Sequence, residues 1–99
     1  MRNLVLSVKA AKQLDGIFEF IDARWSESVR KKVALKIYKN FKSIEKNPEL
    51  FPNSAYNKEL KKCVVSRQTT IFFKYTLSKI TIVSVFDTRQ SPNKINTIK

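Results

Sequence analysis

The last third of the chain constrains the fold most, because it holds two strand-like runs with almost nothing between them. Residues 69–77 and 79–86 are rich in Ile, Val, Phe, Tyr and Thr, which favour β-strands, and only Ser78 separates the two runs. This arrangement predicts a β-hairpin. The second run continues directly into the sequence DTRQSP, so its strand carries Arg89 to the edge of the sheet, where we expect any chemistry of the chain to lie.

Both faces of the second run are apolar, which is typical of a strand at the centre of its sheet. Because side chains alternate along a strand, Ile80, Ile82 and Phe86 are predicted to share one face. Val83 and Val85 are predicted to lie on the other face.

Two amphipathic helices are predicted before the hairpin, after a short first strand at residues 3–6. Ser7 and Ser26 are suited to cap the two N-termini, and the second helix must stop at Asn47 and Pro48. Each helix carries an apolar stripe at spacings of three and four residues. The stripes are Ala11, Leu14, Phe18, Ile21 and Trp25 in the first helix, and Val29, Val33, Ile37, Phe41 and Ile44 in the second.

A loop at residues 47–57, a strand at residues 59–66 and a turn at residues 66–68 that presents Arg67 are predicted between the helices and the hairpin. The order is therefore β-α-α-β-β-β, an α+β fold. Because each helix must bury its stripe, we expect the helical hairpin to pack on one face of a small, mainly antiparallel sheet. With 99 residues, a single domain over residues 1–99 is expected.

Composition narrows the class of protein further. An apolar content of 42% with 11% aromatic residues is too high for a disordered chain. No apolar run approaches the length of a membrane span, and the N-terminus lacks the apolar region of a signal peptide, so a cytoplasmic protein without a membrane partner is predicted.

The chain has no histidine and one cysteine, which limits its chemistry. Ser-His-Asp and Cys-His nucleophile systems are excluded, and the usual zinc sites would need His or several Cys, so no metal or other cofactor is expected. Any general acid or base must be Lys, Tyr, Asp or Glu. The lone Cys63 is expected to be a small buried hydrophobe.

The net charge of +12 favours association with a polyanion, whether nucleic acid, an anionic membrane surface or an acidic protein segment. A lysine-rich composition without a specific partner is the simpler alternative. The second helix carries a basic stripe, which is either a solvated face or a surface for nucleic acid or a protein partner: Lys32, Lys36, Lys39 and Lys46.

Three motifs in this order resemble one known family. They are LVLSVKAAKQLDGIFEFI at the first strand and helix, NPELFP after the second helix, and IVSVFDTRQSP at the end of the hairpin. Together with the order β-α-α-β-β-β they resemble the RelE/ParE superfamily of toxins from type II toxin-antitoxin systems. The resemblance covers nearly the whole chain, and its sharpest part is the terminal strand with Arg followed by Pro.

The resemblance implies one of two activities. ParE-like members inhibit DNA gyrase, whereas RelE-like members cleave mRNA in the ribosomal A site with a basic cluster on the sheet. By position, Lys61 matches a sheet lysine of RelE-like enzymes and Arg89 matches the arginine of their last strand. Arg67 is placed to substitute from the adjacent turn, and Lys62 or Tyr75 would contribute only if it faces the same side.

Three positions depart from the RelE-like pattern. Cys63 stands where a second lysine is expected, Thr70 where an arginine opens the third strand, and Ile95 where a tyrosine lies near the C-terminus. The catalytic groups of such a site act as a unit, so the loss of several of them should lower the rate of cleavage by orders of magnitude. These departures therefore favour the ParE-like branch. The resemblance also implies a cognate acidic antitoxin that orders on binding.

The candidate residues therefore have two roles. Lys61, Lys62, Arg67 and Arg89 are candidates for binding the target or nucleic acid, and in the RelE-like alternative Lys61, Arg67 and Arg89 would be catalytic. A non-catalytic RNA-binding domain is a third alternative, with base stacking on the aromatic residues of the third strand: Phe72, Phe73 and Tyr75.

Simpler roles are open for the same residues. Arg89 would pair with Asp87 or with a carboxylate of the first helix, and the two lysines would discourage edge-to-edge association of sheets. For the functional role, we expect Arg89 to lie on the surface with its side chain on the helix-free side of the sheet, so that its removal leaves the fold intact.

Overall fold

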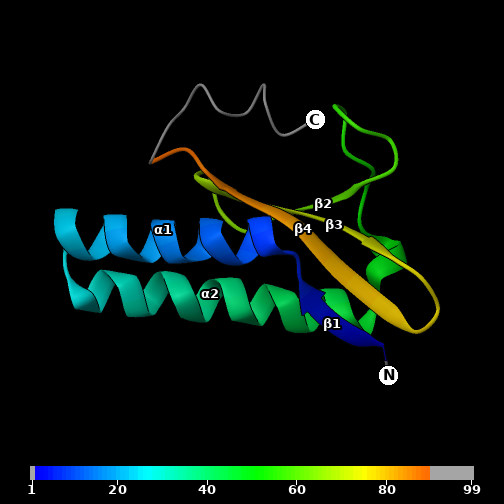
Figure 1. Ribbon diagram of the computed structural model, residues 1–99, viewed down its shortest axis with the longest axis horizontal. Coiled ribbons are helices and arrows are strands. Elements are labelled where there is room, and N and C mark those ends of the chain that lie inside the picture. The colour runs from blue at the N-terminus through cyan, green and yellow to red at the C-terminus, as the bar shows by residue number, and fades with distance from the viewer. Residues whose placement is uncertain (1, 90–99) are drawn as a thin grey trace.

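The computed structural model describes residues 2–89 and has the predicted order of elements. A first strand is followed by two long helices, a short 3₁₀ helix and three strands (Figure 1). The elements are β1 (Asn3–Leu6), α1 (Val8–Arg24), α2 (Glu27–Lys46), η1 (Pro48–Leu50), β2 (Lys61–Val64), β3 (Thr69–Tyr75) and β4 (Lys79–Asp87).

The strands form one mixed sheet in the order β1-β4-β3-β2. The last three strands are an antiparallel meander, as predicted, and β1 adds to β4 in parallel, with Leu4 opposite Ile80. The prediction that the final strand lies centrally is confirmed, because β4 pairs with a neighbour on each side. The α+β class and the mainly antiparallel sheet are therefore as the sequence indicates.

The helices lie side by side in opposite directions and form one layer against the sheet (Figure 1). Their buried residues include Leu14, Ile17 and Ile37, which share a core with residues of the sheet such as Ile71 and Phe73. We call this side of the sheet the helix-covered face. Most of each predicted apolar stripe therefore lies against the sheet, as the periodicity predicts. The exception is Trp25, which follows the last residue of α1 and is 53% exposed.

The predicted faces of β4 are wrong for its second half. Ile80, Ile82 and Val85 all belong to the core beneath the helices, whereas Phe86 packs with Phe72 on the opposite face. The reason is a β-bulge: Phe73 pairs with Ile82 and the preceding Phe72 with Ser84, which leaves an extra residue in β4. An extra residue reverses the alternation beyond it.

The bulge is held by the start of α1. Ser7 caps this helix, since its hydroxyl accepts from the N–H of Ala10 at 3.0 Å, and the same hydroxyl donates to the carbonyl of Val83 at 2.9 Å. Beyond the end of β1, the Gln13 Oε1 atom accepts from the N–H of Val85 at 2.8 Å. Side chains of the first helix therefore complete the edge of β4 that β1 leaves unpaired.

Several element ends differ from the sequence prediction. Strand β2 is shorter than residues 59–66, because turns formed by Leu60 with Asn57 and by Ser66 with Thr69 occupy its flanks. The hairpin turn is longer than a break at Ser78, since the N–H of Thr76 bonds to the carbonyl of Lys79. The predicted loop after α2 contains η1.

None of the helices in residues 2–89 is both long enough and apolar enough to cross a membrane.

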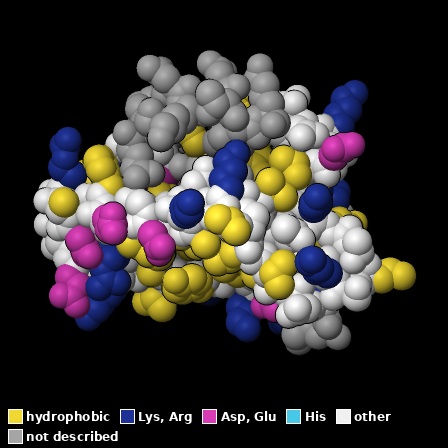
Figure 2. Space-filling view, in the orientation of Figure 1, with side chains coloured by type: hydrophobic (Ala, Val, Ile, Leu, Met, Phe, Trp, Pro, Cys, Tyr) yellow, Lys and Arg dark blue, Asp and Glu magenta, His cyan; other side chains and the backbone are white. Residues whose placement is uncertain are grey.

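Charge is distributed unevenly over the surface. Figure 2 shows one face of the molecule, on which most of the acidic side chains gather over the helices at the left of the view, whereas Lys and Arg side chains are spread across the face. Helix α1 contributes Asp15, Glu19 and Asp22, and Asp22 forms an ion pair of 2.9 Å with Arg30 of α2. The acidic residues of α1 therefore offset part of the positive charge of α2.

Candidate functional site

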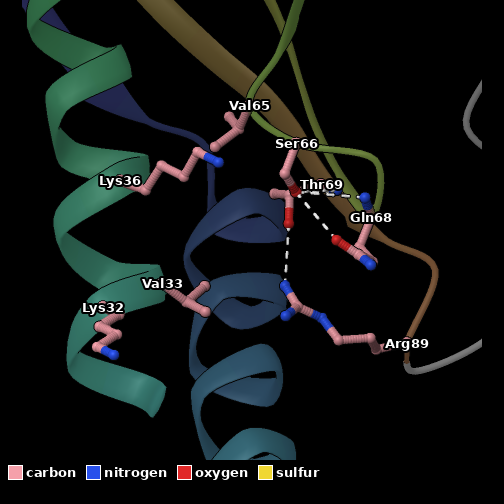
Figure 3. A pocket seen from close by; sticks show the side chains of 8 residues that line it. All are labelled: Lys32, Val33, Lys36, Val65, Ser66, Gln68, Thr69 and Arg89. Carbon is pink, nitrogen blue, oxygen red and sulfur yellow. Dashed lines mark hydrogen bonds between the residues drawn. The ribbon is translucent and has the colours of Figure 1, made fainter. Parts of the chain in front are cut away.

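A small pocket lies between α2 and the turn that joins β2 to β3, with a volume of about 180 Å³. Figure 3 shows the side chains that line it, with helical residues on one side and the turn and Arg89 on the other. The helix contributes two lysines on either side of a valine, and the turn contributes hydroxyl and amide groups. The lining residues are Lys32, Val33, Lys36, Val65, Ser66, Gln68, Thr69 and Arg89.

Arg89 is fixed in this pocket by the carboxylate at the end of β4. Its Nε atom donates to Asp87 Oδ1 at 3.0 Å and its Nη2 atom to Asp87 Oδ2 at 2.7 Å. Nη2 also donates to the hydroxyl oxygen of Thr69 at 3.2 Å, and that hydroxyl donates to Asp87 Oδ2 at 2.7 Å. This is a two-point ion pair, the stronger geometry of an arginine with a carboxylate.

Asp87 is almost fully buried, yet it stays ionised because of these partners. Burial acts to raise the pKa of its carboxyl, but hydrogen bonds from Arg89 and Thr69 outweigh that effect and leave the pKa below its usual value. The Asp87 side chain is 1% exposed and that of Arg89 is 21% exposed. The guanidinium is therefore the part of the pair that solvent or a ligand can reach.

The predicted position of Arg89 is therefore wrong. Its side chain turns back toward α2 and Thr69, and Thr69 belongs to the same strand face as the buried core residue Ile71, not to the helix-free side. The simpler alternative, pairing with Asp87, is what the structure contains. An unpaired buried carboxylate would be costly, and the guanidinium two residues later is in reach to compensate the charge of Asp87.

Lys61 is held away from this pocket, in the first position of β2. Its ammonium donates to the carbonyl of Phe51 at 2.9 Å and to Asn53 Oδ1 at 3.2 Å. Because a strand rises about 3.3 Å per residue, Lys61 lies on the order of 13 Å along the strand from the β2–β3 turn. The lysine secures the segment after η1 to the sheet.

Lys62 and Arg67 occupy two further places. Lys62 is opposite Phe72 in the sheet and so faces away from the helices, on the other side from Lys61. Arg67 is exposed in the β2–β3 turn. The neighbouring Gln68 accepts a hydrogen bond from the backbone of Thr88, so Arg67 and Arg89 share one end of the sheet. The structure thus brings these two arginines to the same end and places the lysines elsewhere.

The positions that depart from the RelE-like pattern do not supply the missing groups. Cys63 is buried, as predicted, with its Sγ atom 3.3 Å from Asn40 Oδ1, and burial raises the pKa of its thiol to about 11. Thr70 lies opposite Phe86 on the face away from the helices. Ile95 is outside the described residues.

The aromatic residues of β3 are mostly committed to the core. Phe72 and Phe73 are buried on opposite faces of the sheet, and Tyr75 is half-buried beneath the guanidinium of Arg2, 5.3 Å from its ring centre. Buried rings have no face left for a base, so Phe72 and Phe73 cannot supply the stacking that the RNA-binding alternative requires, and Arg2 covers one face of the Tyr75 ring. No group of three or more His, Cys, Asp or Glu among residues 2–89 is placed to hold a metal ion.

Sequence reasoning missed part of this pocket. Lys32 and Lys36 were recognisable only as members of a basic stripe, and Asp87 only as one candidate partner of Arg89. A signal was present, because lysines at positions i and i+4 lie on one helix face. That face meets the β2–β3 turn only through long-range packing, which the stripe itself does not encode.

Comparison with known proteins places the fold. Residues 4–92 match the family model described as the ParE toxin of the type II toxin-antitoxin system, parDE. The search of curated protein sequences found no match. A solved chain of the chromosomal ParDE system from P. aeruginosa is similar, with a TM-score of 0.77 and 17% identity over 88% of this chain and 96% of that one.

Two other solved structures share the fold at lower similarity. The YoeB dimer from Staphylococcus aureus has a TM-score of 0.60 and 17% identity, over 86% of this chain and 94% of that one. A chain of the E. coli DinJ-YafQ complex has a TM-score of 0.54 and 13% identity, over 92% and 98%.

Proposed function

This chain belongs to the ParE toxin family of type II toxin-antitoxin systems, and we propose that it acts in the cytoplasm as a toxin that inhibits DNA gyrase. We also propose that a cognate acidic antitoxin neutralises it. The gyrase assignment rests on one observation in the structure: the four candidate cations do not converge on a common point.

A nuclease of the RelE-like kind needs such convergence. Cleavage by a 2′-hydroxyl requires a base for that hydroxyl, cations for the developing charge and an acid for the leaving oxygen, all around one phosphate. Here the Lys61 ammonium bonds to Phe51 and Asn53, Lys62 faces the other side of the sheet, and Arg89 pairs with Asp87. Binding a protein target needs no such constellation, which favours the gyrase proposal over ribosome-dependent cleavage of mRNA.

The proposal of an antitoxin partner is supported by charge and by one neighbour. The net charge of +12 favours an acidic segment by simple attraction. One of the similar solved structures is a complex, DinJ-YafQ from E. coli. We place the contact with gyrase at the end of the sheet that carries Arg67 and Arg89, because arginine is among the residues most often responsible for affinity in protein interfaces.

Expression of the chain in a bacterial host, with DNA and protein synthesis followed separately, tests the activity. DNA synthesis should stop first, and the purified chain should inhibit supercoiling by gyrase. Early arrest of translation with cuts in mRNA at the ribosomal A site would overturn the proposal in favour of the RelE-like alternative.

Two variants locate the contact. Arg67→Gln and Arg89→Lys should lose toxicity at equal levels of folded protein, whereas Lys79→Gln, at the exposed start of β4 and the other end of the sheet, should remain toxic. Full toxicity of both arginine variants would show that gyrase is contacted elsewhere.

A further inference from the structure

The pocket between α2 and the β2–β3 turn has an excess of positive charge. Three cations line it, Lys32, Lys36 and Arg89, and among residues 2–89 the one ion pair that any of them forms is that of Arg89 with Asp87. Within residues 2–89 neither lysine takes part in an ion pair, and both are exposed. Figure 3 shows the ammonium of Lys36 extending from the helix toward the turn.

Some N–H groups of Arg89 have no acceptor among residues 2–89. A guanidinium has five N–H groups, and Asp87 and Thr69 engage only those on Nε and Nη2. In the described part of the chain, Nη1 donates to no acceptor. The pocket therefore combines a fixed guanidinium, with donors still free, and two exposed ammonium groups.

The size and walls of the pocket define what fits. A volume of about 180 Å³ is below the roughly 300–1,000 Å³ of pockets that hold a cofactor or drug-sized ligand, so it suits a single side chain rather than a nucleotide. Val33 and Val65 supply apolar walls, which suit the methylene groups of an acidic side chain better than a hydrated phosphate diester.

We propose that this pocket binds one carboxylate side chain of an acidic protein segment, with the Nη1 of Arg89 and the ammonium groups of Lys32 and Lys36 as its partners. The occupant that we assign is the antitoxin, and that assignment rests on the proposed function. Residues 90–99 of the chain carry two lysines and no acidic residue, so they offer no side-chain carboxylate of their own.

Carboxylate binding can be tested without any antitoxin. The full ¹⁵N-labelled chain is titrated at constant ionic strength with sodium butyrate, sodium phosphate or sodium chloride, and NMR shifts are followed. Butyrate should give saturable shifts at the backbone N–H groups of Ser66, Gln68 and Thr69 and at Nε of Arg89. Larger saturable shifts with phosphate would overturn the proposal in favour of a nucleic-acid site, and equal shifts with chloride would show charge screening only.

Variants of the two lysines then test whether the pocket binds an acidic peptide. Binding of the amphipathic peptide Ac-LEELLEELLEEL-NH₂ is compared with that of the same peptide with Gln in place of Glu, by calorimetry at moderate salt. Because an exposed ion pair changes affinity by about two- to fivefold, Lys32→Gln and Lys36→Gln should each weaken the Glu peptide by that factor, and together by about tenfold.

A lysine on the same helix provides the matched control. Lys39→Gln removes the same charge from α2 but lies outside the pocket, so it should weaken the peptide less than twofold. Equal losses for Lys36→Gln and Lys39→Gln would mean that net charge, not the pocket, binds the peptide. If butyrate does not bind to the wild-type chain, the proposal that the pocket binds a carboxylate is refuted, whereas the toxin proposal is unaffected. If the chain does not inhibit gyrase, the toxin proposal is refuted, whereas carboxylate binding by the pocket is unaffected.

Discussion

Replacing Arg89 by Ala should destabilise the protein by about 2 kcal/mol, although the residue lies at the surface end of a strand. The change removes two direct bonds to the Asp87 carboxylate, at 3.0 and 2.7 Å. Breaking a fully buried ion pair costs roughly 3–5 kcal/mol. The cost is lower here because the Arg89 side chain is 21% exposed and because Thr69 and a backbone N–H remain bonded to the carboxylate.

Urea unfolding at pH 7 measures this effect, with Arg67→Ala as the control. Arg67 is exposed in a turn, and its removal should change the free energy of unfolding by about 0.5 kcal/mol or less. For a domain of this size the loss of about 2 kcal/mol corresponds to a fall in Tm of about 8–16 °C. If the two arginine variants are equally stable, the ion pair with Asp87 does not contribute to folding.

The pH dependence gives a second check. The folded-state pKa of Asp87 lies below its unfolded value of about 4. A group with a depressed pKa contributes stability that is complete above the unfolded pKa and is lost as the pH falls through the folded pKa. In Arg89→Ala the buried carboxyl loses the partner that lowers its pKa, so it takes up a proton at a higher pH than in the wild-type protein. The difference in stability between the two proteins should therefore be largest near neutral pH and should shrink as the pH falls into the acid range. A difference that persists undiminished at pH 2 would assign the effect to packing instead.

Burial and capping give three further predictions. Cys63, whose thiol has a pKa near 11, should react with a thiol reagent at pH 8 at least roughly 100 times more slowly than a free cysteine, and a rate like that of glutathione would contradict its burial. Ile82→Ala should lower the free energy of unfolding in urea by about 2–5 kcal/mol. Leu77 is 91% exposed, so Leu77→Ala should lower it by about 0.5 kcal/mol or less. Similar values for the two variants would mean that Ile82 is not in the core. Ser7→Ala should lower the free energy of unfolding by about 1–2 kcal/mol, and Ser26→Ala by about 0.5–1 kcal/mol. The larger loss is expected at Ser7 because, of the two capping serines, Ser7 is the one that also bonds to the bulge in β4. Equal losses would show that the hydrogen bond to the bulge does not stabilise the protein.

The order of elements was accessible from the sequence because its signals are local. Capping serines, apolar spacing of three and four, and a run of β-branched and aromatic residues each act within a few neighbouring residues. For this reason the bounds of β1, α1 and α2 agree with the prediction almost to the residue. The resemblance to toxins rested on the same motifs, and the family match over residues 4–92 confirms it.

The arrangement of the candidate site depended on contacts between distant segments. One extra residue in β4 reversed the faces of Val85 and Phe86, because alternation holds only while the strand pairs without a bulge. Lys61 donates to Phe51 and Asn53, which lie ten and eight residues earlier in the chain. That segment has no periodicity from which its position could be predicted.

The sequence by itself determined the elements, their order and the burial of Cys63, since these follow from propensity, periodicity and composition. The direction of Arg89 and the pocket beside it were decided by the tertiary structure alone. Arg89 turns toward Asp87 because a buried carboxylate is costly to leave unpaired, and Asp87 is buried only when the chain is folded. Lys32 and Lys36 join the pocket only because packing of α2 on the sheet brings them to the β2–β3 turn.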